Sequence, residues 1–341
     1  MRLFDRGFKK FCDILLPALL GLFVFYNISY TDDIDAYYAS YNGDEIGDYG
    51  YKLLEGIGNC LNFDFLQFEN SIFFLILILF SIVFYLYRVN TYLGIFLTIL
   101  LNYVQIANQL RYFLAVPVLL LSFYYFFIAH KKIFGIILSI VAFSLHSGVI
   151  AWMSFIPLTI WLESRHIGYN KLLKIYLVIG VVVLMTFATL SKYLFSIDQK
   201  YESYTADMSS WLGTVFILAY PVCCIVVVRY CYKTYGTKIL ATKINSLAYS
   251  MSLFSVVWCI ASLSKYQVIN ARYVNAFFAT WIIAMYSKNE QFRFPLKLLL
   301  LFAISAIFLK QILPILLFGY ETSDIYKATL IWQSKFVNLL L

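Results

Sequence analysis

The sequence predicts an all-α, polytopic integral membrane protein, and three features of its composition carry this prediction. Of its 341 residues, 62% are apolar and 20% are aromatic. Charged residues make up 13%, about half of the roughly 25% that is usual in soluble globular proteins. So few charges cannot cover a surface that faces water, and lipid must therefore surround most of the chain. This excludes a cytosolic enzyme, a nucleic-acid-binding protein and a disordered linker.

The chain contains about eleven segments that resemble membrane-spanning helices, each of which needs about 20 mostly apolar residues. They are 14–30, 70–87, 91–108, 112–129, 133–145, 147–162, 172–191, 211–228, 244–263, 273–287 and 296–318. The first span follows a basic N-terminus, as a signal peptide would, but no small-residue cleavage site comes after it. We therefore expect this span to be retained. The stretch 133–162 is interrupted by polar residues and glycine at 144–148. We interpret it as a tight helical hairpin rather than one long kinked helix, because 30 residues exceed one comfortable crossing.

The distribution of charge predicts that the N-terminus is cytoplasmic. With this orientation, 17 of the 26 basic residues lie in inner loops or the inner tail, as the positive-inside rule requires. The net charge of +8 then reflects topology and needs no nucleic-acid partner. The sequence thus predicts a single polytopic domain over residues 1–341.

Most of the acidic residues fall on the opposite side, in two outer loops, 31–69 and 192–210. The first loop combines nine carboxylates with tyrosines that include Tyr38, Tyr41 and Tyr51. Carboxylates accept hydrogen bonds from sugar hydroxyls, and tyrosine faces cover the apolar side of pyranose rings. A solvated loop with interfacial aromatics is the alternative for any single residue. Taken together, the loops indicate a polar ligand outside the membrane.

Three outer-face residues are candidates for chemistry. Arg111 and Arg272 each open a span, and Lys265 precedes the second of them. Either arginine can snorkel or pair with a loop carboxylate, or its planar fork can bind a diphosphate. His146 lies in an apolar stretch, where it is either a hydrogen-bonded core residue or a general base. No nucleotide-binding motif is present, which favours a donor already activated on a lipid.

The order of these motifs resembles the Wzy-type O-antigen or exopolysaccharide repeat-unit polymerases, in particular their EpsG-like branch. The matching segments are Asp35-Ala36-Tyr37-Tyr38, Asp48-Tyr49-Gly50-Tyr51-Lys52-Leu53-Leu54, Gln109-Leu110-Arg111-Tyr112-Phe113-Leu114-Ala115, Lys131-Lys132, Phe143-Ser144-Leu145-His146-Ser147 and Arg272-Tyr273. The chain departs from the pattern at residues 28–31, where the family often has arginine and glycine. It also has Leu110-Arg111-Tyr112 where the family has Arg-Gln.

The resemblance implies a location in the bacterial cytoplasmic membrane with the active site on its outer face. It also implies transfer of a growing glycan from undecaprenyl diphosphate to an incoming lipid-linked repeat unit. Arg111 and Arg272 would hold the donor diphosphate. His146, Asp35 or Asp48 would accept the proton of the acceptor hydroxyl. The implied partners are the lipid-linked repeat units, membrane lipid and a chain-length regulator. We expect no metal and no other cofactor, although nine loop acids could suggest a divalent ion.

Two other activities remain open at this point, besides a purely structural membrane subunit in which the outer arginines and His146 would be replaceable. A flippase or transporter for a lipid-linked oligosaccharide would use the same arginines without bond chemistry, but its polar groups commonly lie near the membrane midplane within repeats. Here they gather at the outer edge and no repeat is visible. An O-antigen ligase-like transferase would use the same chemistry with a different acceptor.

Overall fold

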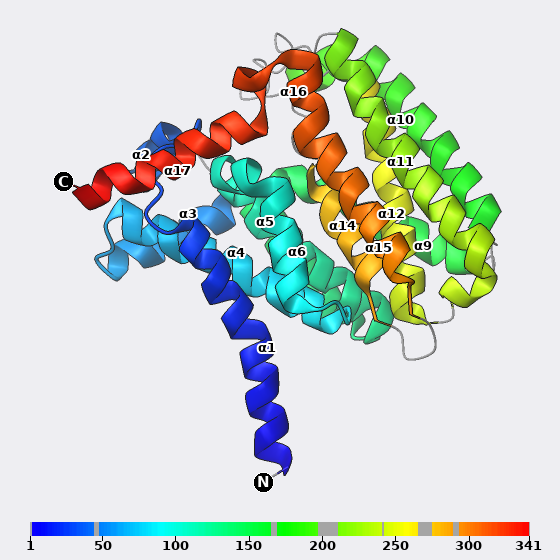
Figure 1. Ribbon diagram of the computed structural model, residues 1–341, viewed down its shortest axis with the longest axis horizontal. Helices are drawn as coiled ribbons and strands as arrows, with labels where there is room; N and C mark the ends of the chain where they lie inside the picture. The colour runs from blue at the N-terminus through cyan, green and yellow to red at the C-terminus, as the bar shows by residue number, and fades with distance from the viewer. Residues whose placement is uncertain are drawn as a thin grey trace. The chain divides into compact units, whose positions relative to one another are not determined.

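The structure is a computed structural model that describes residues 2–43, 48–164, 169–196, 211–240, 242–264, 275–288 and 293–340 (Figure 1). In these residues all secondary structure is helical, which confirms the predicted all-α class. The α-helices are α1 (Arg2–Phe25), α2 (Ile34–Tyr41), α3 (Tyr49–Cys60), α4 (Phe65–Leu86), α5 (Thr91–Asn108), α6 (Leu110–Phe123), α7 (Lys132–Leu145), α8 (Ile150–Met153), α9 (Phe155–Ser164), α10 (Tyr169–Ser196), α11 (Trp211–Tyr235), α12 (Lys243–Ala261), α14 (Asn275–Tyr286), α15 (Leu296–Ile307), α16 (Leu313–Phe318) and α17 (Asp324–Leu340).

The chain divides into two compact units. The first contains residues 1–153, 286–288 and 310–341, and the second contains residues 154–285 and 289–309. The predicted single polytopic domain stays a prediction, because a membrane domain can itself contain several compact groups of helices.

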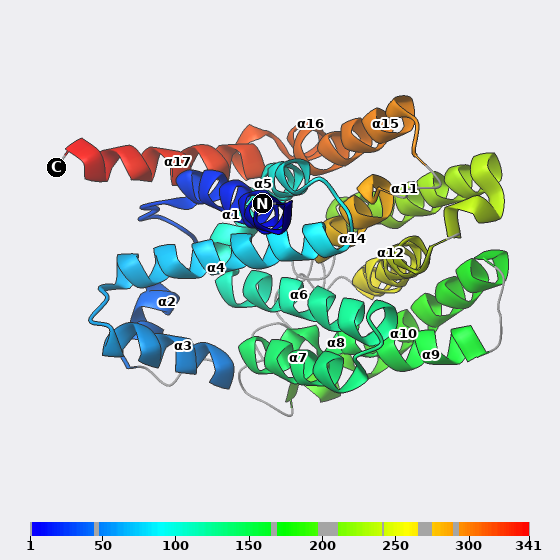
Figure 2. The same ribbon diagram turned by 90° about the horizontal axis from the view of Figure 1, so that it is seen from below.

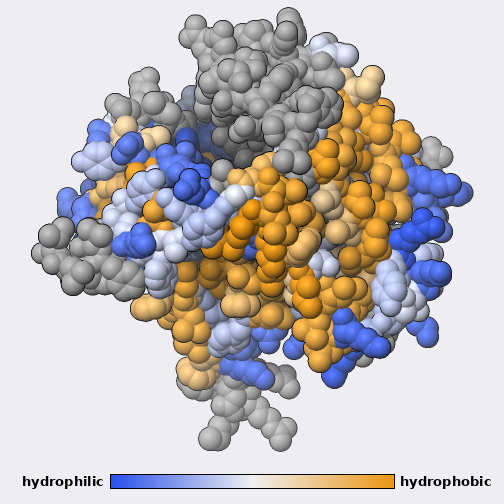
Figure 3. Space-filling model, turned by 45° about the horizontal axis from the view of Figure 1, so that its top comes forward, coloured by the Kyte–Doolittle hydropathy of each residue, from blue (hydrophilic) through white to orange (hydrophobic). Residues whose placement is uncertain are grey.

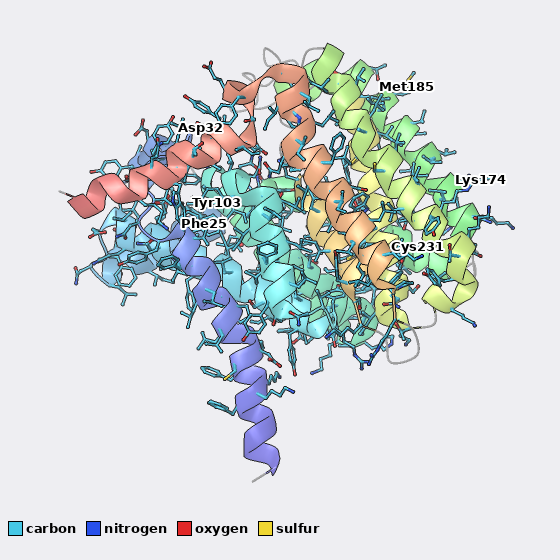
Figure 4. All side chains as sticks on the ribbon, viewed as in Figure 1. Phe25, Asp32, Tyr103, Lys174, Met185 and Cys231 are labelled. Carbon is cyan, nitrogen blue, oxygen red and sulfur yellow. The ribbon has the colours of Figure 1, made fainter. Side chains whose placement is uncertain are left out.

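The first unit is built around the packing of α1 on α4 and of α6 on α7. Figure 2 shows α1 between α17 and α4, with α2 and α3 on the far side of α4. Phe25 of α1 stacks on Phe73 of α4 at 4.9 Å and contacts Tyr103 of α5 at 5.2 Å between ring centroids, and Figure 4 shows Phe25 and Tyr103 together. Between α6 and α7 the hydroxyls of Ser122 and Ser139 are hydrogen-bonded at 2.6 Å. Such buried hydroxyl pairs suit helices that cannot rely on the hydrophobic effect to associate in lipid.

The second unit packs α10 and α11 against α12. The Tyr176 hydroxyl of α10 is hydrogen-bonded to Ser250 of α12 at 2.8 Å. Ser255 of α12 is similarly bonded to Thr280 of α14 at 3.2 Å. Trp281 of α14 then packs edge-on against Phe302 of α15.

The predicted spans overlap with helices of the structure, but their number as crossings is not confirmed. In the described residues, five helices are long and apolar enough to cross a membrane: Phe65–Leu86, Thr91–Asn108, Leu110–Ile128, Lys243–Ser264 and Leu296–Phe318. Shorter apolar helices occupy Lys132–Leu145, Ser147–Trp161 and Asn275–Tyr286. The expected break in 133–162 is present at His146, whereas the hairpin and the N-in orientation stay predictions.

Apolar side chains also cover much of the surface, as lipid contact requires. Figure 3 shows hydrophobic residues gathered broadly on the visible face, with hydrophilic residues toward its margins. Phe23 of α1, Ile133 of α7 and Leu296 of α15 are each more than two-thirds exposed. Such side chains can face outward where lipid, rather than water, surrounds the protein.

The region 31–69 is more ordered than the predicted loop. It contains α2, α3 and the first turn of α4, and Asp64 caps α4 by accepting a hydrogen bond from the Gln67 N–H at 2.7 Å. The three glycines of α3 have low helix propensity, which is why sequence alone favours a loop here. Contacts of α3 with α7 stabilise the helix instead.

Candidate functional site

Asp48 and His146, 98 residues apart in the sequence, are joined in the first unit. The Asp48 Oδ2 atom lies 3.0 Å from the His146 Nδ1 atom, and Asp48 Oδ1 accepts a hydrogen bond from the Ser147 N–H at 3.2 Å. Both side chains are nearly buried, with 9% and 11% of their surfaces exposed. With Asp48 ionised, Nδ1 carries the proton and Nε2 is the ring nitrogen with the lone pair.

Asp48 occupies the N-cap position of α3, yet its side chain does not cap that helix. An aspartate at this position ordinarily accepts a hydrogen bond from the first turn and stabilises the helix by about 1 kcal/mol. Here both carboxylate oxygens bond to the segment that follows α7 instead. The local preference of the residue is therefore overridden by a tertiary contact, which is common at functional sites.

A close approach of two helices makes this contact possible. A Cβ atom on Gly50 would lie 2.5 Å from the Ser144 Oγ atom and 2.9 Å from its carbonyl carbon. Only glycine therefore lets the first turn of α3 rest against the end of α7. α7 ends at Leu145, and His146 then adopts an extended conformation (φ −158°, ψ 114°) that turns its ring toward Asp48.

Arg111 lies beside this pair, over two tyrosine rings. Its guanidinium carbon is 5.4 Å from the centroid of the Tyr37 ring and 5.9 Å from that of Tyr51, within the range of a cation–π interaction. The Tyr37 hydroxyl and the Asp48 carboxylate also act on the guanidinium electrostatically. In the described residues no carboxylate lies within ion-pair distance of Arg111. Its charge is therefore held mainly by aromatic faces.

The two tyrosines are neutral partners for this cation. Burial raises the pKa of Tyr37, against the opposing effect of Arg111, and raises the pKa of Tyr51 well above its ordinary value. A buried hydrogen bond joins α2, which carries Tyr37, to α3, which carries Tyr51. The Ser40 hydroxyl of α2 donates to Glu55 Oε1 of α3 at 2.7 Å, and Lys52 pairs with Glu55 Oε2 at 3.4 Å.

Arg111 stands in the first turn of α6, because a single non-helical residue, Gln109, separates α5 from α6. A cation is disfavoured at a helix N-terminus, where the backbone N–H groups already carry partial positive charge. The same combination of N–H groups and guanidinium is well suited to an anion. We call the five residues Tyr37, Asp48, Tyr51, Arg111 and His146 the His146 cluster.

Two neighbours orient the imidazole of the cluster. The Tyr112 ring meets the His146 ring edge-on, with centroids 5.4 Å apart. The Tyr112 hydroxyl in turn accepts a hydrogen bond from Trp152 Nε1 at 3.3 Å. Gly148 lies close to the other edge of the ring, where a Cβ atom would be 3.0 Å from His146 Nε2. A side chain at position 148 would therefore crowd this edge of the imidazole.

The structure brings together only some of the predicted site residues. Arg111, Asp48, His146 and Tyr51 meet in the His146 cluster. Asp35 is exposed in the first turn of α2, and in the described part of the chain no hydrogen bond or ion pair joins it to Arg111 or His146.

The remaining predicted residues differ in exposure. Tyr38 is 56% exposed, as a carbohydrate platform requires. Tyr41 and Tyr51 are buried, and Tyr41 stacks on Phe68 while its hydroxyl donates to the Phe63 carbonyl at 2.7 Å. Direct sugar contact by these two rings stays a prediction. Lys265 and Arg272 lie outside the described residues, as do residues 197–210 of the second acidic loop.

Sequence reasoning did not single out Tyr37, Tyr112 or Trp152. Tyr37 belongs to the Asp35-to-Tyr38 motif, so the motif itself was the available signal. Tyr112 follows Arg111 directly, but nothing in the sequence indicates that Trp152 would reach it. In the residues that the structure describes, no three His, Cys, Asp or Glu side chains gather as a metal site would need. The expectation of no metal stays a prediction.

The sequence model of the EpsG family matches residues 10–322, a range that includes the whole His146 cluster. The chain belongs to the EpsG family. This confirms the resemblance seen in the motifs. No curated protein and no solved structure matches the chain. The EpsG family is associated with polymerase-like glycosyltransferases of polysaccharide biosynthesis, and together with the apolar helices it indicates a membrane protein.

Proposed function

We propose that this EpsG-family protein is an exopolysaccharide or O-antigen polymerase with its active site on the outer face of the cytoplasmic membrane. It transfers a growing glycan from undecaprenyl diphosphate to an incoming lipid-linked repeat unit. The observation that carries the proposal is the His146 cluster, in which an oriented imidazole lies beside an arginine that has no carboxylate ion-pair partner among the described residues.

His146 is the proposed general base. Asp48 accepts a hydrogen bond from Nδ1–H, so Nε2 is the nitrogen that takes the proton of the acceptor hydroxyl. The carboxylate then stabilises the imidazolium that forms, as in other acid–base pairs of this kind. The glycine at position 148 keeps a side chain away from Nε2, because a Cβ atom there would lie 3.0 Å from this nitrogen. Asp35, exposed and apart from this pair, is the weaker candidate for the base.

Arg111 is the proposed binding residue for the diphosphate of the donor. Its half-buried fork and the N-terminal N–H groups of α6 together offer donors and positive charge to an anion. Tyr37 and Tyr51 hold the guanidinium plane without neutralising its charge. We expect Arg272 to hold the diphosphate as well, as the family resemblance implies, and Lys265, which precedes it in the sequence, to add further positive charge.

The proposed reaction needs no co-reactant beyond its two substrates. The acceptor oxygen attacks the anomeric carbon of the donor sugar, and a new glycosidic bond forms. The bond between that carbon and the diphosphate oxygen breaks, and undecaprenyl diphosphate leaves with the electron pair. The acceptor proton goes to His146. Arg111 stabilises the charge on the leaving group, and direct displacement would invert the anomeric configuration.

An oriented acid–base pair favours an enzyme over a transporter. A flippase or transporter for a lipid-linked oligosaccharide would need the cation of Arg111 but has no use for an imidazole held in one tautomer. A ligase-like transferase would share both groups, and only its acceptor would differ.

The polymerase is tested by the surface glycan of cells that lack this protein. We expect single repeat units without a ladder in these cells, and a full ladder when the wild-type chain is restored. His146→Gln should leave single units, whereas the control variant His130→Asn should restore the ladder. His130 is exposed and has a left-handed conformation (φ 55°) that asparagine adopts readily. Complete loss of repeat units from the surface would instead indicate export or ligation.

A further inference from the structure

Asp32 connects the two segments that carry Tyr37 and Arg111. Its N–H donates to Asn108 Oδ1 at 3.3 Å, and Asn108 Nδ2 donates back to Asp32 Oδ2 at 3.0 Å. Asp32 lies just before α2, which carries Tyr37. Asn108 ends α5, three residues before Arg111. The reciprocal pair therefore fixes the two segments relative to one another close to where the guanidinium meets the Tyr37 ring.

Helix α17 bonds to this pair. Lys327 Nζ lies 2.6 Å from Asp32 Oδ2, the oxygen that Asn108 also uses. One turn earlier on α17, Asp324 accepts a hydrogen bond from Gln105 Nε2 at 2.8 Å and pairs with Lys310 at 3.1 Å. The first turn of α17 thus lies against the last turn of α5. Figure 4 shows Asp32 beside α17.

The other half of α17 is fastened to α1. Lys335, only 8% exposed, donates to the carbonyl oxygens of Phe23 at 2.7 Å and Val24 at 3.0 Å. A cation bound to the last carbonyls of a helix is favourable. Ser29 and Ser334 add two hydrogen bonds of 3.3 Å. α17 is therefore held along its length, and it begins after residue 322, where the match to the EpsG family ends.

We propose that α17 is a positioning element for Arg111, which acts through Lys327, Asp32 and Asn108. The inference rests on the proposed role of Arg111 in binding diphosphate. Lys327 holds Asp32, and Asp32 holds Asn108. Because only Gln109 separates Asn108 from α6, the position of Asn108 also sets the position of the first turn of α6. Without Lys327 the α5–α6 turn and the segment before α2 separate more easily, so the guanidinium is less well ordered over Tyr37.

Because the ion pair is exposed, its effect on Arg111 can be measured separately from any effect on folding. Lys327 and Asp32 side chains are each 43% exposed. An ion pair this exposed contributes little to the stability of a protein. Loss of Lys327 should therefore leave the melting temperature almost unchanged, while its effect on Arg111 remains measurable.

The test is binding of undecaprenyl diphosphate to the purified full chain in detergent micelles. We expect Lys327→Gln to bind about 2- to 5-fold more weakly than the wild type, the range that an exposed pair allows. Lys327→Glu should bind more weakly still, because it places like charges together. The matched control is Lys297→Gln, an exposed lysine on α15, which should bind as the wild type does.

Two further variants identify the route of the effect. If α17 acts through Arg111, then Lys327→Gln should have no additional effect in the Arg111→Ala background. Lys327→Arg, which keeps a cation beside Asp32 and leaves the bond of Asp32 to Asn108 in place, should bind about as the wild type does. This rescue, with an unchanged melting temperature in Lys327→Gln, would exclude a general loss of fold.

The outcomes separate the two proposals. If Arg111→Ala binds undecaprenyl diphosphate as tightly as the wild type does, the role of Arg111 is overturned, and with it the positioning role of α17. Binding that depends on Arg111 but is the same in Lys327→Gln, Lys327→Glu and the wild type would overturn the α17 proposal alone. Additive effects of Lys327→Gln and Arg111→Ala would also contradict it.

Discussion

The carboxylate of Asp48 bonds to His146 Nδ1 at 3.0 Å with one oxygen and to the Ser147 N–H at 3.2 Å with the other. Two helices that are far apart in the sequence are thereby joined at one imidazole. A carboxylate held in this way fixes both the orientation of the ring and the nitrogen that carries its proton.

Asp48→Asn should reduce polymerisation strongly, by about 10²- to 10⁴-fold if His146 is a general base. The amide has almost the same size, but its NH₂ group can donate to Nδ1 and favour the wrong tautomer. His146→Gln should cost a similar factor. The double variant should be little worse than either single variant, because the two residues act as a unit. Multiplied losses in the double variant, measured as initial rates, would argue against the pair.

Arg111→Lys should lower the rate by about 10²-fold, the cost of losing one well-placed donor to a developing charge. Lysine keeps the charge but has neither the planar fork nor the stacking surface for Tyr37 and Tyr51. The rate and the melting temperature should be measured together. Full activity of Arg111→Lys would show that a bidentate grip is not needed.

Gly50→Ala should move α3 away from α7 and so separate Asp48 from His146. The added Cβ atom would lie 2.9 Å from the Ser144 backbone carbonyl carbon, and overpacking of this kind costs about 1–3 kcal/mol. Gly56→Ala on the same helix is the control, because nothing lies within 4 Å of its Cβ position. We expect this control to unfold at the same or a slightly higher temperature. Equal melting temperature and activity of the two variants would refute the close approach.

The raised pKa of Tyr51 predicts that the protein loses stability at alkaline pH. Its folded-state pKa is raised well above the ordinary value, first by burial, so the unfolded chain releases its proton at a lower pH than the folded protein does. The free energy of unfolding is therefore at its full value below about pH 10 and falls as the pH rises toward the raised pKa. Melting temperatures between about pH 8 and pH 11 should fall less steeply for Tyr51→Phe. Parallel curves for the two proteins would mean that Tyr51 does not contribute.

Much of the helical framework could be predicted from the sequence because it depends on long apolar runs. The predicted span 91–108 coincides with α5, and 296–318 coincides with the apolar helix Leu296–Phe318. The break at His146 follows from the polar residues and glycine around it. By contrast, α2 and α3 depend on tertiary contacts, such as those of α3 with α7, which lies far away in the sequence. Local polarity and glycine content therefore favoured a loop.

The candidate site was predicted as separate residues, and its pairing was not. Asp48, Arg111 and His146 carry the family motifs, but no local signal joins Asp48 to His146 across 98 residues. At Asp48 the local preference even favours a different role, that of a helix cap. The contact of Asp32 with Lys327 spans 295 residues and depends on the C-terminal helix. Such partners become visible only when the helices are packed.

The most direct test of the central claim is to incubate the purified chain with a lipid-linked repeat unit and to measure both glycan length and released undecaprenyl diphosphate. We predict that the wild-type chain lengthens the glycan and releases one undecaprenyl diphosphate for each unit added. His146→Gln and Asp48→Asn should be folded and nearly inactive. No lengthening by the folded wild-type chain, or normal lengthening by both variants, would contradict the account.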